Sequence, residues 1–383
     1  MYGNICKSDL EDVRLLFDEN DPKLTQGPKV RHFEKKWSDW LGTKYSIFVN
    51  SGSSANLLSL TALKILYPKG GEIIVPALTW SSDIVSVIKS GFVPKFVDIN
   101  LKTLGLDENK IIENINEKTI AVFITHCQGY NALSDNLLNY LKKHKIHLIE
   151  DVCESHGAKH KNIKLGNFGL MSNFSFYYAH HMTTIEGGMI CTNDEEIADL
   201  IRCLRGHGLL REMSNEKRKH SLISQYQNLN PEFIFLHAGF NMRNDEISAI
   251  IGINQLKRLD SNIIKRNLNY HYFFDKMKNK NIFNNFFDDG ISNYAINLIS
   301  KFQDKKFFKK LVKLLDELNI EYRIGSAGGG NQLRQPYLKN SNFSVDINLP
   351  VTDHVHFYGL YIGNFPELQR ENIDHLVNKI NEL

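Results

Sequence analysis

Residues 172–191 have the sequence SNFSFYYAHHMTTIEGGMIC, and we expect the rest of the chain to support this stretch. The aromatic residues Phe174, Phe176 and Tyr178 alternate, which is the period of a half-buried strand. The apolar run 189–191 predicts a second strand. Between them lies a polar turn with a pair of glycines, where the backbone can approach a ligand closely. Taken alone, the stretch predicts a hairpin with surface histidines.

The size and composition of the chain indicate an ordinary globular protein. Its 383 residues leave room for two domains, and 42% hydrophobic and 23% charged residues are typical of globular chains. The formal net charge is +3 and the lysines are scattered, so we expect no nucleic-acid partner. The polar, acidic start MYGNICKSDLEDV and the lack of 18 consecutive apolar residues predict no secretory signal and no membrane span. The expected location is the cytoplasm.

The cysteine pattern argues against a disulfide framework. The chain has five cysteines, an odd number, and no C-x-x-C pair. Long gaps between them also disfavour a zinc or iron–sulfur site built from neighbouring thiolates, and no metal is expected. We therefore predict buried free thiols. The cysteines are Cys6, Cys127, Cys153, Cys191 and Cys203.

A strand–turn–helix unit occupies residues 45–63, YSIFVNSGSSANLLSLTAL. We predict a strand over 45–49, a turn of small residues over 50–54 and a helix from Ala55. Backbone N–H groups and serine hydroxyls at the start of a helix form a site for a phosphate, and the helix dipole adds to the attraction. The unit lacks the lysine of a nucleoside-triphosphate loop and the G-x-G-x-x-G of a dinucleotide turn. A capped helix without a ligand explains it equally well.

Two further residues follow predicted strands. The strand EIIVPALTW (72–80) ends in Trp80, whose ring could stack on a planar ligand or belong to the core. The strand 147–150 is followed by Asp151, and an acid at the carboxyl end of a central parallel strand points into the ligand crevice. Paired with a ring nitrogen, such an acid stays ionised and keeps that nitrogen protonated. Capping of a following helix is the alternative role.

Strands and helices alternate through the first 190 residues, which predicts an α/β fold with a mostly parallel sheet covered on both faces. Residues 212–232 lack periodicity and predict a loop or flap. A helix over 239–259 and an aromatic-rich helix over 262–278 follow, the second joining two domains. The end of the chain predicts a smaller α+β unit. The expected domains are residues 1–260 and 261–383.

A phosphate site, a stacking aromatic residue, an acid at a strand end and the Ser/His stretch occur in one chain. Together they predict a flat, phosphorylated heteroaromatic ligand whose ring nitrogen pairs with a carboxylate. Pyridoxal 5′-phosphate (PLP) meets these requirements.

On these motifs the chain resembles the DegT/DnrJ/EryC1/StrS family of sugar aminotransferases, which are fold type I PLP-dependent enzymes. The resemblance covers nearly the whole chain and implies a large domain with a mostly parallel, seven-stranded sheet and a smaller C-terminal α+β domain. The segments that carry it are NSGSSA, PALTW, EDVCESHGA, SFYYAHHMTTIEGGM, GFNMR and GLYIGN.

One position departs from the family pattern. The family reads S-F-x-x-x-K, with E-G-G six residues further on, and its lysine attaches the cofactor covalently. Here Ser175-Phe176 leads to His180 at the lysine position, and Glu186 begins the E-G-G six residues later. Imidazole cannot form that bond, so the resemblance implies PLP or pyridoxamine 5′-phosphate (PMP) held without covalent attachment. Histidine also titrates near neutral pH and can move protons.

The resemblance assigns roles to individual residues. His180 is the catalytic base, and His181 is expected to be structural or exposed to solvent. Asn241 would reach the cofactor phosphate of a neighbouring subunit, which implies a homodimer with a shared active site. The expected cofactor-binding residues are Gly52, Ser53, Ser54, Trp80, Asp151, Glu154, Ser175 and Asn241. The expected contacts with a nucleotide sugar are Asn331, Arg334, His356 and Tyr361, together with the glycine-rich segment 326–331.

The lysine-less subgroup of the family implies a PLP/PMP-dependent 3-dehydratase. Such an enzyme removes the C3 hydroxyl of a nucleotide-linked 4-keto-6-deoxy sugar, with GDP-4-keto-6-deoxy-D-mannose of the colitose pathway as the favoured substrate, L-glutamate as amino donor, and ammonia and 2-oxoglutarate as products. A related subgroup carries an iron–sulfur cluster on clustered cysteines, which this chain lacks. Two alternatives stay open: a nucleotide-sugar aminotransferase that uses another lysine, and an inactive binding or regulatory protein with the same fold.

Overall fold

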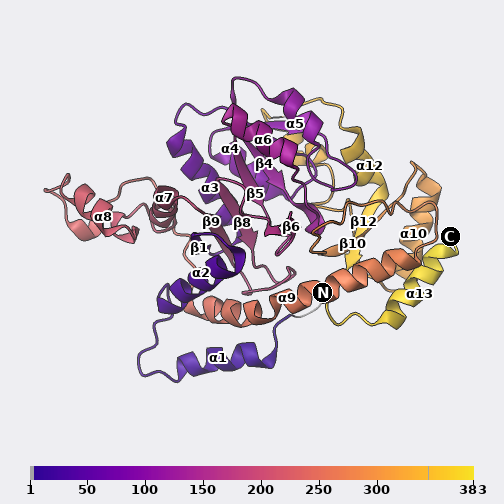
Figure 1. The fold of residues 1–383 in the computed structure, drawn as a ribbon, viewed down its shortest axis with the longest axis horizontal. Helices are drawn as coiled ribbons and strands as arrows, with labels where there is room; N and C mark the ends of the chain where they lie inside the picture. Colours follow the sequence, from indigo (N-terminus) through magenta and orange to yellow (C-terminus); the bar gives the residue numbers. More distant parts are fainter. Residues whose placement is uncertain (1–3, 344) are drawn as a thin grey trace.

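A seven-stranded sheet forms the centre of the larger, N-terminal part of the protein (Figure 1). The structure is a computed structural model that describes residues 4–343 and 345–383. Neighbouring strands pair in parallel around β5, which lies between β4 and β8. In their order across the sheet, the strands are β1 (Tyr45–Val49), β9 (Gly188–Thr192), β8 (Met171–Ser175), β5 (His147–Asp151), β4 (Thr119–Thr125), β2 (Glu72–Pro76) and β3 (Val93–Val97).

The hairpin predicted over 172–191 is present as β8 and β9, which pair antiparallel and give the sheet its one reversed strand among the described residues. The predicted half-buried strand over 174–178 is wrong, because β8 ends at Ser175 and all its residues are buried. Helices cover both faces of the sheet, so neither face of β8 meets solvent. Phe176 still continues the pairing, since its N–H donates to the carbonyl of Gly187 at 2.9 Å.

Two apolar clusters cover the two faces of this sheet. One contains residues of α2 (Pro28–Leu41), α5 (Glu108–Asn114), α6 (Asp135–His144) and α9 (Glu246–Lys276). The other contains residues of α3 (Gly52–Leu66), α4 (Ser81–Lys89) and α7 (Glu195–Arg205). This is the doubly covered arrangement that a near-continuous apolar parallel strand requires.

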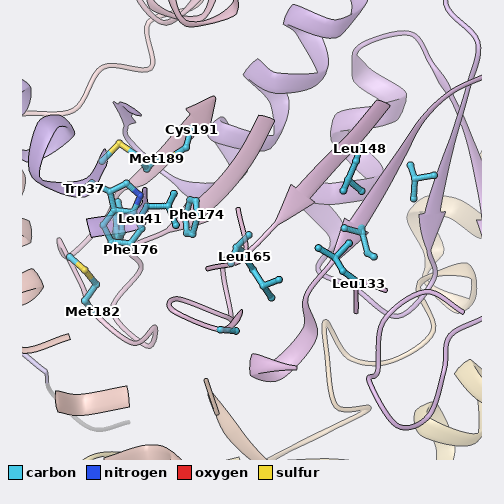
Figure 2. Packing of buried hydrophobic residues seen from close by; sticks show 14 of the residues in the cluster. Trp37, Leu41, Leu133, Leu148, Leu165, Phe174, Phe176, Met182, Met189 and Cys191 are labelled. Atoms are coloured by element: carbon cyan, nitrogen blue, oxygen red, sulfur yellow. The ribbon is translucent and has the colours of Figure 1, made fainter. Parts of the chain in front are cut away.

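Aromatic packing fixes the β8–β9 hairpin against α2. Figure 2 shows Trp37, Phe174 and Phe176 side by side, and the Trp37 ring lies 5.1 Å from the Phe174 ring and 4.8 Å from the Phe176 ring, centroid to centroid. Both contacts are edge-to-face, the favourable geometry for aromatic pairs. The three side chains are fully buried. The loop that follows β8 therefore starts from a rigid base.

A single helix of 31 residues, α9, replaces the two helices predicted over 239–259 and 262–278. It begins at Glu246, where Asp245 caps it through a hydrogen bond from the N–H of Ser248, and runs across the lower part of the molecule, above α1, towards α13 (Figure 1). The predicted domain boundary between residues 260 and 261 falls inside this helix. The division into two domains stays a prediction.

A three-stranded antiparallel sheet lies in the C-terminal part, in the order β10 (Ala295–Ile299), β12 (Gly359–Gly363) and β11 (Tyr322–Ile324). Its apolar cluster draws on α9, α10 (Lys305–Glu317) and α13 (Arg370–Asn381). Between β11 and β12 the chain forms α11 (Pro336–Lys339) and α12 (Pro350–Tyr358). Two short strands, β6 (Lys159–His160) and β7 (Ile163–Lys164), form a separate hairpin.

The first helix, α1, spans Lys7–Phe17 and is capped at Cys6, whose N–H donates to the Asp9 carboxylate at 2.9 Å. The prediction of a loop or flap over 212–232 needs correction. The region 212–232 contains α8 (Glu216–Ile223), which projects from the body beside α7 (Figure 1). No helix of the described residues is long and apolar enough to cross a bilayer.

Candidate active site

A cavity of about 1060 Å³ opens where the carboxyl ends of β5 and β8 face the small sheet. It collects residues from both parts of the chain, including Asp151 at the end of β5, Ser175 at the end of β8 and Tyr361 on β12. Strand ends of an open α/β sheet are where such folds bind ligands. Of the described residues that line the cavity, none is a lysine.

The start of α3 forms one wall of the cavity through Ser51, Gly52 and Ser53. Ser51 caps the helix, because its hydroxyl accepts a hydrogen bond from the Ser54 N–H at 3.1 Å. A Cβ at Gly52 would lie 2.6 Å from the Cβ of Ser175, so only glycine allows these two segments to approach this closely. The helix begins three residues earlier than predicted. Ser53 and Ser175 face the cavity, whereas Ser54 is outside its lining.

Trp80 lies at the mouth of the cavity as the residue that precedes α4. Its side chain is 62% exposed, so it does not belong to the core, which was the competing interpretation of its position. An indole that is exposed beside a cavity offers a large apolar surface to a planar ligand.

Asp151 is the last residue of β5 and only 5% exposed. One carboxylate oxygen, Oδ1, accepts a hydrogen bond from the Cys153 N–H at 2.9 Å, and the other, Oδ2, accepts one from the Asn56 amide at 3.0 Å. No helix of the described residues begins at Asp151, so the capping role is excluded. Two donors and a place in the cavity lining make it an oriented carboxylate.

Of the two adjacent histidines, only His180 lines the cavity, whereas His181 is buried outside the lining. The buried Nδ1 of His180 has no hydrogen-bond partner among the described residues. Burial, aided by the positive charge of Arg266, lowers the pKa of His180 to about 4. The expectation that this imidazole titrates near neutral pH is therefore wrong for the cavity without ligand. A neutral imidazole with a free nitrogen can accept a proton.

Glu154 lies beside Asp151 in the cavity lining. Burial raises the pKa of Glu154 to about 7, against the effect of a hydrogen bond of 2.9 Å that its carboxylate accepts from the Gln128 N–H. The nearby Asp151 charge raises the pKa further. A carboxyl group that titrates near neutrality can donate or accept a proton.

The residues predicted to contact a sugar separate into two groups. Tyr361 on β12 lines the cavity, but Asn331, Arg334 and His356 do not. Arg334 instead makes a bidentate pair with Asp353, at 2.9 and 2.8 Å. The Asn331 amide donates to the same carboxylate at 2.8 Å, and the Asn331 N–H donates to His356 Nδ1 at 3.2 Å. These three residues hold the glycine-rich segment in place.

Asn241 is exposed and lies outside the lining of the cavity within one chain. Its backbone forms an isolated bridge with Gly206, at the base of the segment that carries α8.

Asp83 and Arg266 also line the cavity, although the sequence reasoning did not select them. Asp83 lies in the first turn of α4, which begins directly after Trp80. Arg266 lies in the middle of α9 and donates to the Tyr294 carbonyl at 3.0 Å. Within the described residues, no cluster of His, Cys, Asp and Glu is arranged to hold a metal ion, and all five cysteines are free thiols.

The residues present fit PLP or PMP. The glycine at position 52 leaves the N-terminus of a 15-residue helix open to the cavity, where its partial positive charge suits a phosphate. The exposed Trp80 suits one face of a ring, and the Asp151 carboxylate suits a protonated ring nitrogen.

Comparison with known proteins gives the same picture. Residues 5–381 match the DegT/DnrJ/EryC1/StrS aminotransferase family. The GDP-4-keto-6-deoxy-D-mannose 3-dehydratase of Escherichia coli O55:H7 is 35% identical over 363 residues, which are 93% of this chain and 93% of that protein. A crystal structure of a GDP-4-keto-6-deoxymannose-3-dehydratase mutant with bound GDP-perosamine superimposes with a TM-score of 0.87 at 31% identity, covering 99% of this chain and 98% of the other.

A second crystal structure of GDP-4-keto-6-deoxymannose-3-dehydratase, with a trapped PLP–glutamate geminal diamine, gives the same TM-score, identity and coverage. The match spans both the large sheet and the small one, and it includes the hairpin from which the site is built. The chain belongs to the DegT/DnrJ/EryC1/StrS aminotransferase family.

Proposed function

We propose that this protein is a PLP/PMP-dependent 3-dehydratase, which removes the C3 hydroxyl of a nucleotide-linked 4-keto-6-deoxy sugar, most simply GDP-4-keto-6-deoxy-D-mannose. The observation that carries the proposal is His180, which lines the cavity at the position where the family has its lysine. The cavity lining offers no lysine among the described residues. Similarity to the named 3-dehydratases supports both the reaction and the substrate.

Four groups would hold the cofactor without a covalent bond. The start of α3 with Gly52 and Ser53, together with the Ser175 hydroxyl, would bind its phosphate. Trp80 would stack on the ring, and Asp151 would pair with the ring nitrogen, with Glu154 beside it. Ser54 would act through the helix cap, since its N–H bonds Ser51.

When bound, PMP supplies an amino group that condenses with the sugar ketone and a ring that accepts electrons as the C3 hydroxyl leaves. His180 would accept a proton on its imidazole ring and return it later, because it lines the cavity and is unprotonated at neutral pH. The net reaction balances: the keto sugar loses one oxygen at C3, and L-glutamate becomes 2-oxoglutarate and ammonia. Glutamate is therefore consumed once per turnover.

We also propose a homodimer in which Asn241 completes the phosphate site of the partner subunit. Asn241 is exposed and outside its own cavity lining. The segment before it exposes large apolar side chains, with Phe233 57% and Phe235 59% exposed. Apolar surface of this kind favours an interface with a second copy. Mixing inactive His180→Asn and Asn241→Asp variants should restore activity, because a mixed dimer contains one intact site; no restoration would contradict the shared site.

For the nucleotide sugar we propose Tyr361 as a direct contact. We propose that Asn331, Arg334 and His356 contribute by fixing the glycine-rich segment, through the hydrogen bonds to Asp353 and to the His356 ring. Arg334→Lys would break the bidentate pair and should raise the KM for the sugar more than it lowers kcat.

The decisive experiment incubates the protein with PLP, L-glutamate and GDP-4-keto-6-deoxy-D-mannose. We expect ammonia release and a sugar product that has lost the C3 oxygen, detected by mass spectrometry, with His180→Asn as the inactive control. An aminated sugar would instead identify an aminotransferase. Failure to convert PLP to PMP with glutamate would identify an inactive binding protein. A panel of other nucleotide-linked 4-keto sugars then ranks the substrates by ammonia release.

A further inference from the structure

A second carboxyl group lies buried directly behind Asp151. Asp83, in the first turn of α4, is 1% exposed and still forms part of the cavity lining. No cationic side chain is among the described groups that act on the Asp83 carboxyl, and an uncompensated buried carboxylate is costly. The hydrogen bonds of Asp83 therefore indicate whether its carboxyl group is ionised or protonated.

One amide joins the two acids. The Nδ2 of Asn56 donates to Asp83 Oδ1 at 2.7 Å and to Asp151 Oδ2 at 3.0 Å. Asn56 is 1% exposed, and its side chain is held on α3, the helix whose start faces the cavity. Any movement of Asp83 therefore moves the donor that orients Asp151.

The other oxygen of Asp83 belongs to a triangle of three oxygen atoms. Asp83 Oδ2 lies 2.7 Å from the Thr125 hydroxyl and in hydrogen-bond contact with the Thr79 hydroxyl, and these two hydroxyls lie 2.9 Å apart. Three contacts need three hydrogen atoms, and the two threonines supply two. A proton on Asp83 Oδ2 supplies the third. With an ionised Asp83, the contact between Thr79 and Thr125 would lack a hydrogen.

The surroundings of Asp83 also disfavour a second negative charge. The titratable groups around it are Asp151 on β5, Cys127, Cys153 and Tyr337, and none of these carries a positive charge. Burial, and then the negative charge of Asp151, raise the pKa of Asp83 well above its ordinary value. Two neighbouring carboxyl groups in one site share a single negative charge for the same reason.

We propose that Asp83 is a neutral carboxylic acid in the working protein and a positioning residue for Asp151, whose orientation it fixes through Asn56. The pair Asp83–Asp151 then carries one negative charge, located on Asp151, next to the ring nitrogen of the cofactor. The role toward the cofactor rests on the proposed function. The protonation of Asp83 does not depend on it and can be tested in the protein without cofactor or sugar.

Infrared spectroscopy tests the protonation directly. At pH 8, above the pKa of Glu154, we expect the C=O stretch of a carboxylic acid in the unaltered protein, shifted in deuterium oxide and lost in Asp83→Asn. Asp98→Asn is the matched control. Each side-chain hydrogen bond of the buried Asp98 carboxylate is one that it accepts from an N–H or O–H group, so Asp98 should contribute no such band. Its donors are the N–H groups of Ile99, Val351 and Thr352 and the Thr352 hydroxyl. An unchanged band in Asp83→Asn, or no band at all, would overturn the proposal.

The positioning role is tested by PLP affinity, measured by fluorescence titration of the folded variants. Asn mimics a neutral acid, since it offers both a donor to the threonines and an acceptor to Asn56. We expect Asp83→Asn to bind PLP at least tenfold more tightly than Asp83→Ala, which leaves Asn56 free to turn away from Asp151. Equal losses in both variants would show that the charge of Asp83 matters and would contradict the proposal. Absence of sugar turnover would affect only the proposed function.

Discussion

His181 places its Nε2 3.1 Å from both the carbonyl and the hydroxyl oxygen of Ser292. It is 1% exposed, so this histidine is a structural tie between the active-site loop and the segment before β10. The structural role expected for it agrees with this contact. Its neighbour His180 lines the cavity instead, so the two positions should respond differently to the same substitution.

We expect His180→Asn to reduce the rate of sugar turnover by a factor of about 10² to 10⁴, the usual contribution of a general base. The melting temperature should change little. His181→Ala should instead lose about 1–3 kcal/mol of unfolding free energy, because the buried Ser292 carbonyl loses the donor that His181 supplies, although the Ser292 hydroxyl keeps its hydrogen bond to the His156 carbonyl. Ammonia release and thermal denaturation measure the two effects. Turnover by His180→Asn at the unaltered rate would contradict the assignment of the base.

Replacement of His180 by lysine should restore covalent attachment of the cofactor. Borohydride should then trap PLP on the His180→Lys variant and not on the unaltered protein, as detected by the mass of the intact chain. The variant should also form some aminated sugar. Trapping of PLP on the unaltered protein would mean that another lysine serves, which would favour the aminotransferase alternative.

The two tryptophans Trp80 and Trp37 offer a matched comparison. Trp80→Ala should weaken PLP binding by roughly tenfold, about 1.4 kcal/mol, with a change in unfolding free energy within about 0.5 kcal/mol, because the indole is 62% exposed. Trp37→Phe should cost at least about 1 kcal/mol of stability, because Trp37 is fully buried between α2 and the hairpin. An equal loss of stability in both variants would place Trp80 in the core.

The carboxyl group of Glu154 makes the stability of the cofactor-free protein depend on pH. Its folded-state pKa of about 7 lies above the ordinary value of 4.5, so the folded protein binds more protons than the unfolded chain between these values. Stability relative to Glu154→Gln should therefore fall as the pH rises from 4.5 to 7, by roughly 2 kcal/mol after allowance for solvent at this half-buried site. Urea denaturation at several pH values measures it, and a flat difference would be contrary to the expectation.

Gly52→Ala should close the phosphate site. The added Cβ would lie 2.6 Å from the Cβ of Ser175, so one segment must move, and we expect PLP affinity to fall by roughly tenfold, about 1.4 kcal/mol. Gly363→Ala is the control, because a Cβ there meets nothing within 4 Å. Equal PLP affinity in the two variants would show that Gly52 does not shape the site.

Much of the site could be predicted from the sequence, because it sits where strands end. A strand end is marked locally by a change from apolar to polar residues, and Asp151 and the turn at Gly52 were located in this way. The α/β fold class, with its mostly parallel seven-stranded sheet and smaller α+β part, is confirmed by the strand order and by the solved relatives. The position of His180 followed from its spacing to Ser175 and Glu186.

Other features depend on contacts between distant segments and could not be read locally. Asp83 looked like an ordinary first-turn acid of a helix, and only the approach of Asn56 and Thr125 shows that it is buried beside Asp151. Arg334 is a residue type that often contacts a phosphate or a sugar. Its guanidinium group instead pairs with the carboxylate of Asp353, which lies 19 residues further along the chain. The half-buried strand over 174–178 failed for a related reason: alternation of aromatic residues does not reveal that helices cover both faces.

The continuity of α9 has a mechanical consequence. The helix lies against α1 and α2 at its start and against α13 at its end, so it links the two sheets without a flexible joint. Swinging the small sheet away as a rigid body would break backbone hydrogen bonds within the helix, at a net cost of about 0.5–1.5 kcal/mol each. Rotation of the small sheet as a rigid body is therefore not expected to admit ligands to the cavity, and turnover should not depend on motion of whole domains.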